Sequence, residues 1–312
     1  MYSIRCLPSA SAWPAVSSSR SARLLVPLLR SFVSSSYVAE RRPRFGIDLA
    51  TPDRTSKDAA VTTLDRADLY SAQAHPLDSA VWSSLAGPHA RFAEHRAGVR
   101  RYPPDMSPFA GFAPVPDGSS DLDEIRHNDE NWADLATLAG RGGVVALSRP
   151  ERTISRLPAD WHVALRLPGL QMIGTEALVS EPDSEAVVLG AHDVPEMLDL
   201  VRRTKPGPFL PRTREMGRYL GIRRGGALVA MAGERLHPPG WIEVSAVCTD
   251  PAFRGQGLAA RLIRAVVHGI RAADAAPFLH VSAANTPALN LYESLGFVVR
   301  QRTEFFFLRF AG

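Results

Sequence analysis

The most constraining feature of this chain is a strand, a glycine-containing loop and an amphipathic helix that follow one another between residues 241 and 272. Residues 241–249 are largely apolar and predict a buried strand. Apolar residues recur with a helical period over residues 258–272, which predicts a helix with one buried face. Between them, Gly255 and Gly257 permit backbone conformations that other residues avoid. The N–H groups at the start of such a helix form a site suited to a diphosphate.

The two glycines alone do not identify the ligand. A dinucleotide site of the Rossmann type requires a third glycine three residues after the second, where this chain has Ala260. The phosphate loop of NTPases requires Gly-Lys followed by Ser or Thr, and neither Lys57 nor Lys205 follows a glycine. A tight strand-to-helix turn without any ligand therefore stays open at this point.

A second motif lies one expected strand downstream, where Asn285 and Ala288 precede Tyr292, Gly296 and Phe297. Together with the loop Arg254-Gly255-Gln256-Gly257-Leu258-Ala259, it resembles the GNAT superfamily of acyl-CoA N-acyltransferases, which joins an Arg-Gly-x-Gly-x-Ala pyrophosphate loop to an Asn…Ala…Tyr…Gly-Phe helix. The passage Glu243-Val-Ser-Ala-Val-Cys-Thr-Asp-Pro is most similar to the FR47-like branch. The resemblance covers about residues 183–312. It implies an α+β (α/β mixed sheet) fold and acetyl-CoA as co-substrate.

Hydrophobic periodicity over residues 183–312 predicts the element order β-α-α-β-β-β-α-β-α-β-β. The central strand is expected over 244–249, splayed from a neighbour over 278–282, because the resemblance places the pantetheine arm of the cofactor between these strands. The expected cofactor-binding residues are Val247, Thr249, Arg254, Gly255, Gln256, Gly257, Leu258, Ala259 and Asn285.

The resemblance also implies catalytic roles. Tyr292 is expected to act as the general acid toward the departing CoA thiolate, and the backbone N–H of Val247 to stabilise the oxyanion. A protonated amine cannot attack a thioester, so a base is required. Glu243, which is expected on the same strand face as Thr249, is one candidate for this base. A solvated carboxylate at the edge of the sheet is an equally good interpretation of Glu243. Glu234 is its rival.

Other reactive side chains in this region have simpler interpretations. His280 is expected to be a satisfied strand histidine, and His237 a loop residue near the acceptor side. Strand alternation turns Cys248 away from Val247 and Thr249, which favours a role in core packing. The histidines and cysteines show no spacing typical of a metal site, so no metal is expected.

Composition divides the rest of the chain. Residues 1–44 carry seven arginines and one glutamate, so the formal charge of +4 leaves the other 268 residues at −2. A nearly neutral folded part argues against nucleic acid as a partner. Residues 1–74 are expected to be a disordered leader, or to be present only because the start codon was assigned too early. Residues 75–180 are expected to form a smaller α+β lobe, which is a possible degenerate half of an acetyltransferase. No run approaches the length of a membrane span, and the cytoplasm is the expected location.

Two alternatives to catalysis stay open. The first is a catalytically silent module that binds CoA and regulates, and the second is an interaction role carried by the 75–180 lobe, which we expect to wall the acceptor site. The sequence does not separate a small-molecule amine from a peptide amine as acceptor, and it says nothing of oligomeric state.

Overall fold

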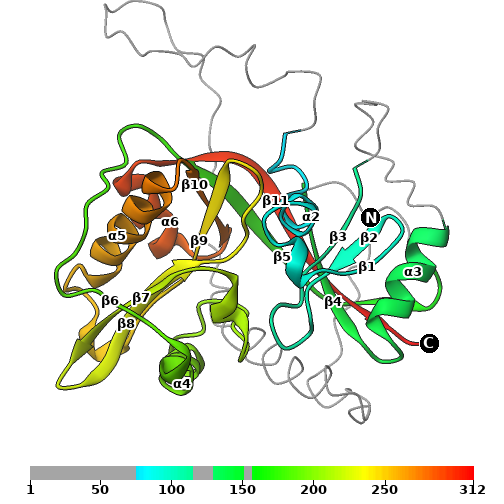
Figure 1. Ribbon diagram of the computed structural model, residues 1–312, viewed down its shortest axis with the longest axis horizontal. Helices are drawn as coiled ribbons and strands as arrows, with labels where there is room; N and C mark the ends of the chain where they lie inside the picture. Colours follow the sequence, from blue (N-terminus) through cyan, green and yellow to red (C-terminus); the bar gives the residue numbers. More distant parts are fainter. Residues whose placement is uncertain (1–74, 115–128, 151–156) are drawn as a thin grey trace, which may run out of the picture.

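An eight-stranded mixed sheet forms the centre of the protein, with strand order β4-β11-β5-β10-β9-β8-β7-β6 (Figure 1). The computed structural model describes residues 75–114, 129–150 and 157–312, so the expectation for residues 1–74 lies outside the described residues. The strands of this sheet are β4 (Val144–Pro150), β5 (Trp161–Gly174), β6 (Val187–Val188), β7 (Tyr219–Arg224), β8 (Ala227–Glu234), β9 (Trp241–Thr249), β10 (Ala276–Ser282) and β11 (Phe297–Phe310). The expected α+β fold with a mixed sheet is confirmed.

A small antiparallel sheet and five α-helices complete the described part of the chain. The small sheet consists of β1 (Glu94–Arg96), β2 (Val99–Arg101) and β3 (Ala110–Phe112). The helices are α2 (Ala80–Ala86), α3 (Asp129–Ala139), α4 (Val194–Thr204), α5 (Leu258–Ala272) and α6 (Thr286–Leu295). Short 3₁₀ turns are η2 (Ala90–Phe92), η3 (Ala191–Asp193), η4 (Thr213–Met216) and η5 (Pro251–Phe253). Among the described residues, no helix has the length and apolar character that a bilayer crossing requires.

The main sheet continues across the boundary expected near residue 180. Strand β5 precedes that boundary, yet it lies between β10 and β11 and pairs antiparallel with both. Strand β4 then pairs with β11 at the edge. Residues 183–312 therefore do not complete the sheet by themselves, because removing β5 would leave two long strands without their shared neighbour.

Two groups of elements cover the two faces of the sheet. Helices α5 and α6 pack on one face through a cluster that includes Leu262, Leu279 and Leu295. The opposite face is covered by α4 at the β7–β9 end and by α2 with its flanking residues nearer β10 and β11. Consecutive residues of β10 therefore point to opposite faces of the sheet: Phe278 belongs to the α2 cluster and Leu279 to the α5 cluster.

The amphipathic pattern of α5 explains why this helix lies where it does. Its buried residues follow the helical period and include the Leu262 and Ile263 side chains, which have no exposed surface. Burying each such side chain contributes roughly 1.5–3 kcal/mol relative to leaving it in water. This packing fixes the start of α5, and therefore the glycine loop, against β9.

The structure merges some of the expected elements. The strands expected over 161–165 and 170–173 form the single strand β5, and those expected over 297–299 and 305–310 form β11. Long antiparallel pairing between β5 and β11 carries both strands through polar positions that interrupt the apolar pattern. The second helix expected before β7 is the 3₁₀ turn η4.

Candidate active site

Strands β9 and β10 are paired over only part of their length. Their parallel register joins residues 241–243 of β9 to residues 276–278 of β10 and ends at the pair Glu243–Phe278. Beyond that pair, β10 continues only against β5, while β9 continues against β8. The main chain of residues 244–249 thus borders an opening in the sheet, at the place expected for the pantetheine arm.

A β-bulge in β9 lies at this opening. Ala246 has a φ of +52° and, with Val247, stands opposite the single residue Ala232 of β8. The extra residue reverses the alternation of side chains. Val244 accordingly packs with α5, whereas Cys248 packs with α4, although residues four apart in a regular strand share a face. The expectation that Glu243 and Thr249 share a face is therefore wrong.

The loop between β9 and α5 presents backbone donors. Gly255 and Gly257 have φ values of +78° and +74°, and a Cβ atom at either position would meet nothing within 4 Å. Gly257 is the N-cap of α5 and offers no side-chain cap. Within the described ranges, no group accepts a hydrogen bond from the N–H of Gly255, Gln256 or Gly257. These donors meet the positive end of the α5 dipole, which is the arrangement that binds phosphate groups.

The preceding residues hold this loop in place. Asp250 accepts a hydrogen bond from the N–H of Ala252 at 2.9 Å and forms an ion pair with Arg203 of α4. The Nε of Arg254 donates to the carbonyl oxygen of Thr249 at 3.3 Å. The Arg254 side chain therefore folds back onto the strand end, and its backbone N–H donates to the carbonyl oxygen of Pro251 at 3.5 Å.

Tyr292 lies on α6 and packs in the cluster beneath α5. It is 8% exposed, and its ring packs edge-on against Phe297 at 5.9 Å between centroids. Burial raises the pKa of Tyr292 to about 12, and the nearby Cys248 thiol adds to the rise. Tyr292 belongs to the cluster beneath α5, while Cys248 belongs to the cluster on the α4 face.

Asn285 is the N-cap of α6, and its side-chain oxygen accepts a hydrogen bond from the N–H of Ala288 at 3.3 Å. This contact explains the asparagine as a helix cap. Asn285 is exposed, and its contact with pantetheine stays a prediction.

The surroundings of Glu243 do not favour it as the base. Its side chain has no exposed surface, and both oxygens bind the guanidinium of Arg235, at 2.6 and 2.8 Å. Nδ1 of His280 lies 2.7 Å from one of these oxygens. Burial alone would raise the pKa of Glu243, but Arg235 and His280 outweigh it and lower the pKa to about 2. A carboxylate so strongly ionised is a weak proton acceptor.

His280 is satisfied by hydrogen bonds, as expected. Its Nδ1 faces Glu243, and its Nε2 lies 3.2 Å from the amide nitrogen of Gln171, which also donates to the carbonyl oxygen of Leu77. The sequence contained no signal for Gln171, because this residue lies on the inserted strand β5. Neither Glu243 nor His280 is therefore free to take a proton from an acceptor.

Glu234, the rival base, has a different environment. It ends β8, is 9% exposed, and accepts one hydrogen bond from the N–H of Arg218 at 3.0 Å. Its Oε2 atom lies 3.6 Å from Nε2 of His237. Burial raises the pKa of Glu234, and the N–H and charge of Arg218 only partly oppose that rise.

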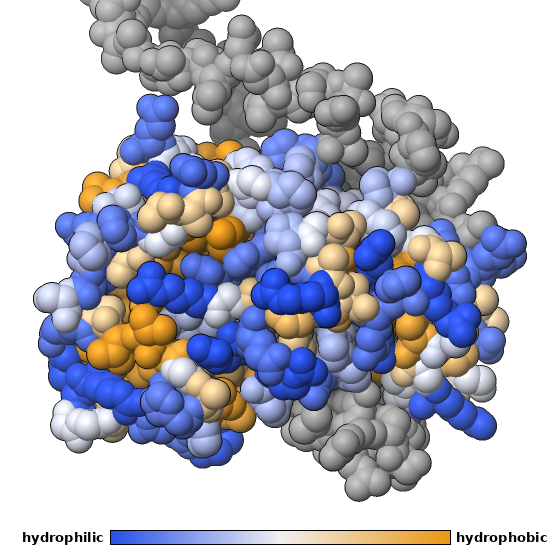
Figure 2. Space-filling view, viewed as in Figure 1, coloured by the Kyte–Doolittle hydropathy of each residue, from blue (hydrophilic) through white to orange (hydrophobic). Residues whose placement is uncertain are grey.

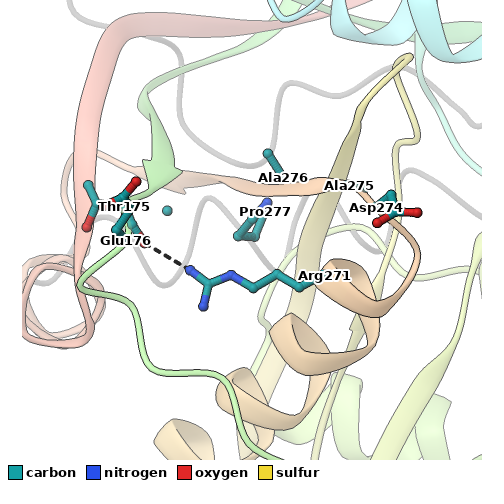
Figure 3. Close-up of a pocket in the computed structure, with 8 residues that line it drawn as sticks. Thr175, Glu176, Arg271, Asp274, Ala275, Ala276 and Pro277 are labelled. Carbon is teal, nitrogen blue, oxygen red and sulfur yellow. Dashed lines mark hydrogen bonds between the residues drawn. The ribbon is translucent and has the colours of Figure 1, made fainter. Parts of the chain in front are cut away.

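A hollow of about 510 Å³ lies elsewhere on the protein, between residues 174–176, the end of α5 and the start of β10 (Figure 3). Thr175, Glu176, Arg271 and Asp274 are its polar lining residues. Arg271 donates to the carbonyl oxygens of Thr175 and Leu178 at 2.9 and 2.6 Å. Through these bonds the Arg271 guanidinium links the end of α5 to residues 175–178. The hollow adjoins the paired start of β10, whereas the opening begins beyond the pair Glu243–Phe278.

One face of the surface and the metal-ligating residue types of the described residues were compared with the opening. The face shown in Figure 2 carries apolar side chains in separate patches divided by hydrophilic ones. In the part of the chain that the structure describes, no three His, Cys, Asp or Glu side chains gather as metal ligands. The opening between β9 and β10 is therefore the strongest candidate site.

Comparisons with known proteins agree with this geometry. The family model described as FR47-like protein matches residues 219–306, from β7 into β11. A crystal structure described as an acetyltransferase from the GNAT family of Novosphingobium aromaticivorans is 40% identical, with a TM-score of 0.66. That similarity covers 75% of this chain and 98% of the other, so it includes elements on both sides of residue 180.

Two of the curated relatives are named as acetyltransferases. The N-alpha-acetyltransferase RimI of Mycobacterium tuberculosis is 35% identical over 129 residues, which cover 37% of this chain and 80% of that protein. The mycothiol acetyltransferase of Corynebacterium glutamicum is 38% identical over 78 residues, which cover 25% of this chain and 27% of that protein. The two relatives are named for different acceptors.

Proposed function

The chain belongs to the GNAT family and is an acyl-CoA N-acyltransferase, and from this premise we propose that it transfers an acetyl group from acetyl-CoA directly to a primary amine. The observation that carries the proposal is the opening that begins at the pair Glu243–Phe278, bordered by the bulge of β9 and continuous with the glycine loop before α5. A thioester whose diphosphate binds that loop would have its acyl end beside residues 244–247.

The bulge supports the oxyanion role proposed for Val247. Ala246 and Val247 have no one-to-one partner in the register with β8, and β10 no longer pairs with this part of β9. An N–H that points at the developing oxyanion contributes more in a water-excluded site than it would in water. The main chain of Val247 and Thr249 likewise borders the path proposed for pantetheine.

Tyr292 fits the role of general acid. Its pKa, raised to about 12, keeps the hydroxyl protonated at neutral pH, so that it can donate to the CoA thiolate as the C–S bond breaks. Among the described residues, the Tyr292 hydroxyl has no hydrogen-bond partner that would compete for its proton. Attack by the amine is direct, because Cys248 is buried and its pKa is raised to about 11, which leaves little thiolate for an acyl-enzyme.

The acceptor belongs to the class of primary amines. The relatives are named for an N-alpha position and for mycothiol, so both a peptide amine and a small-molecule amine are acceptors to test. In this chain α2 and its flanking residues cover the sheet face opposite α5, next to the opening. We propose that this segment walls the acceptor side of the site.

The first experiment is calorimetric titration of acetyl-CoA into the purified protein and into a Gly257→Glu variant. A carboxylate at the start of α5 should repel the diphosphate and abolish measurable binding. Gly140→Glu is the matched control, because Gly140 has a φ of +70°, has open space around it, and lies in the loop after α3. Equal binding by all three proteins would refute the proposed cofactor site.

Turnover is the second readout. Release of free CoA thiol is followed over a panel of peptides and small amines. Binding of acetyl-CoA without thiol release on any amine would instead support a silent regulatory module that holds CoA.

A further inference from the structure

We propose that the chain contains two diverged copies of one acyltransferase unit, that the last strands of the two copies are interleaved in the sheet, and that only the second copy binds acyl-CoA. The first copy extends from β1 to β5 and the second from β7 to β11. The single cofactor site rests on the proposed function, whereas the interleaving rests on the topology alone.

The two copies have the same order of elements. Each begins with three strands that pair antiparallel in chain order, β1-β2-β3 in the first copy and β7-β8-β9 in the second. A helix follows, α3 or α5, and after it a strand, β4 or β10. Each copy ends in a strand of 14 residues, β5 or β11. The second copy differs by the additional helix α6 before its last strand.

The strand before the helix meets the strand after it in the same way in both copies. In the second copy, β9 and β10 are parallel, and the N–H of Ala276 donates to the carbonyl oxygen of Gly240 at 2.9 Å. In the first copy, Phe109 and Ala146 form a parallel bridge, and the N–H of Ala146 donates to the carbonyl oxygen of Pro108 at 2.7 Å. Parallel pairs are the less frequent kind and require a crossover connection, so this agreement supports a common unit.

The helices α3 and α5 cover the same face of the sheet. Phe306 of β11 packs in the cluster of α3, and Leu279 of β10 packs in the cluster of α5. The next residue along β11, Phe307, and the residue before Leu279, Phe278, both belong to the α2 cluster on the other face. A twofold axis perpendicular to the sheet, between β5 and β11, would relate the copies in this way, because it keeps every element on its own face.

The last strands of the copies are interleaved. β5 follows β4 in the chain, yet β11 lies between them, and β11 follows β10, yet β5 lies between them. β5 and β11 pair antiparallel at the centre of the sheet, from the pair Gly174–Phe297 to the pair Trp161–Phe310 (Figure 1). Each copy therefore leaves a gap in its sheet that the last strand of the other copy fills.

The start of the helix distinguishes the copies as cofactor sites. α5 has no acidic residue in its first turn and directly follows the loop of Gly255 and Gly257. α3 instead begins with Asp129 and Glu130. In the sequence before α3, residues 113–128 contain four acidic residues and a single glycine. Carboxylates at a helix N-terminus already interact with its dipole and would repel a diphosphate.

The first copy also lacks the general acid proposed for the second. Tyr292 lies on α6, in the connection between β10 and β11. The corresponding connection between β4 and β5, residues 151–160, contains no tyrosine. The sequence of the first copy therefore offers neither of the two features on which transfer by the second copy is proposed to depend.

What the first copy supplies is a neighbour for β10 at the catalytic opening. β9 stops pairing with β10 at Phe278, but β5 pairs with β10 from Phe278 to Ser282. Without β5, both edges of this part of β10 would lack backbone partners. The interleaving thus lets the sheet open on one side of β10 while the other side stays paired.

The first experiment measures the number of acetyl-CoA sites per full-length chain by calorimetric titration. We expect one site in the wild type and in Gly140→Glu, beside α3, and none in Gly257→Glu. Two sites in the wild type, or one site left in Gly257→Glu, would show that the first copy binds the cofactor, contrary to the inference. Absence of binding by the wild type would count against the proposed function and leave the interleaving to the second experiment.

The second experiment requires no cofactor. Hydrogen exchange at increasing urea, followed by mass spectrometry, reports the opening of each strand. Because β5 and β11 lie between β4 and β10, we expect peptides from all four strands to lose protection at the same urea concentration. Loss of protection in β4 and β5 while β10 and β11 stay protected would overturn the interleaving.

A variant tests the same point across the copies. Phe306→Ala removes a side chain that β11, in the second copy, contributes to the cluster of α3 in the first. It should lower the urea concentration at which protection is lost by the same amount in both copies. A decrease confined to the first copy would contradict the inference, because it would mean that the two copies unfold independently.

Discussion

Replacing Glu243 with glutamine should destabilise the protein through Arg235. The Arg235 side chain is only about 10% exposed. In the variant its guanidinium loses the anion that accepts two of its hydrogen bonds. Breaking a buried ion pair from one side generally destabilises a protein by about 3–5 kcal/mol. That is a large share of the roughly 5–15 kcal/mol by which most domains are stable.

The pKa of Glu243 gives a second, independent value for its contribution to the free energy of unfolding. The pKa of Glu243 falls from 4.5 to about 2 on folding, and at 1.36 kcal/mol per unit this difference corresponds to about 3 kcal/mol. Because the folded pKa is the lower one, this stability is fully present above about pH 4.5 and is lost as the pH falls through 2. The glutamine variant should lack this part of the acid dependence.

The assay is urea denaturation at pH 7 and at pH 3.5, followed by tryptophan fluorescence. We expect Glu243→Gln to unfold at a clearly lower urea concentration than the wild type at pH 7, while Glu176→Gln unfolds with the wild type. Adding Arg235→Met to a Glu243→Leu variant should recover most of the loss, since an apolar pair leaves no buried charge. A Glu243→Gln protein of wild-type stability that had lost catalysis would refute this reasoning and return Glu243 to the role of base.

The other predictions concern the acid and the boundary of the catalytic unit. Tyr292→Phe should lower kcat by about 10²-fold or more while the dissociation constant of acetyl-CoA stays the same, because the variant lacks only the hydroxyl group. Stopped-flow thiol release measures kcat, and calorimetry measures the dissociation constant. An unchanged kcat would exclude Tyr292 as the acid. A fragment of residues 183–312 should be insoluble or inactive, because it lacks β5, which pairs with both β10 and β11; a soluble fragment with full activity would show that the sheet closes without it.

The sequence by itself determined the local parts of this site. Gly255 and Gly257 predicted a loop whose φ values are indeed positive, and the periodicity from Leu258 predicted the helix behind it. Such features follow from a few neighbouring residues, because left-handed backbone favours glycine and a buried helix face repeats every 3.6 residues. The loop, α5, α6 and Tyr292 were therefore predictable.

The tertiary structure decided what depends on residues far apart in the chain. The bulge at Ala246 reverses the alternation that had placed Glu243 beside Thr249, and nothing in the local pattern marks it. Strand β5 enters the sheet from before the expected boundary and brings Gln171 to His280. Whether a carboxylate is a base or half of an ion pair depends on which charges fold against it. Packing alone engaged Glu243 with Arg235 and placed Glu234 against the backbone N–H of Arg218.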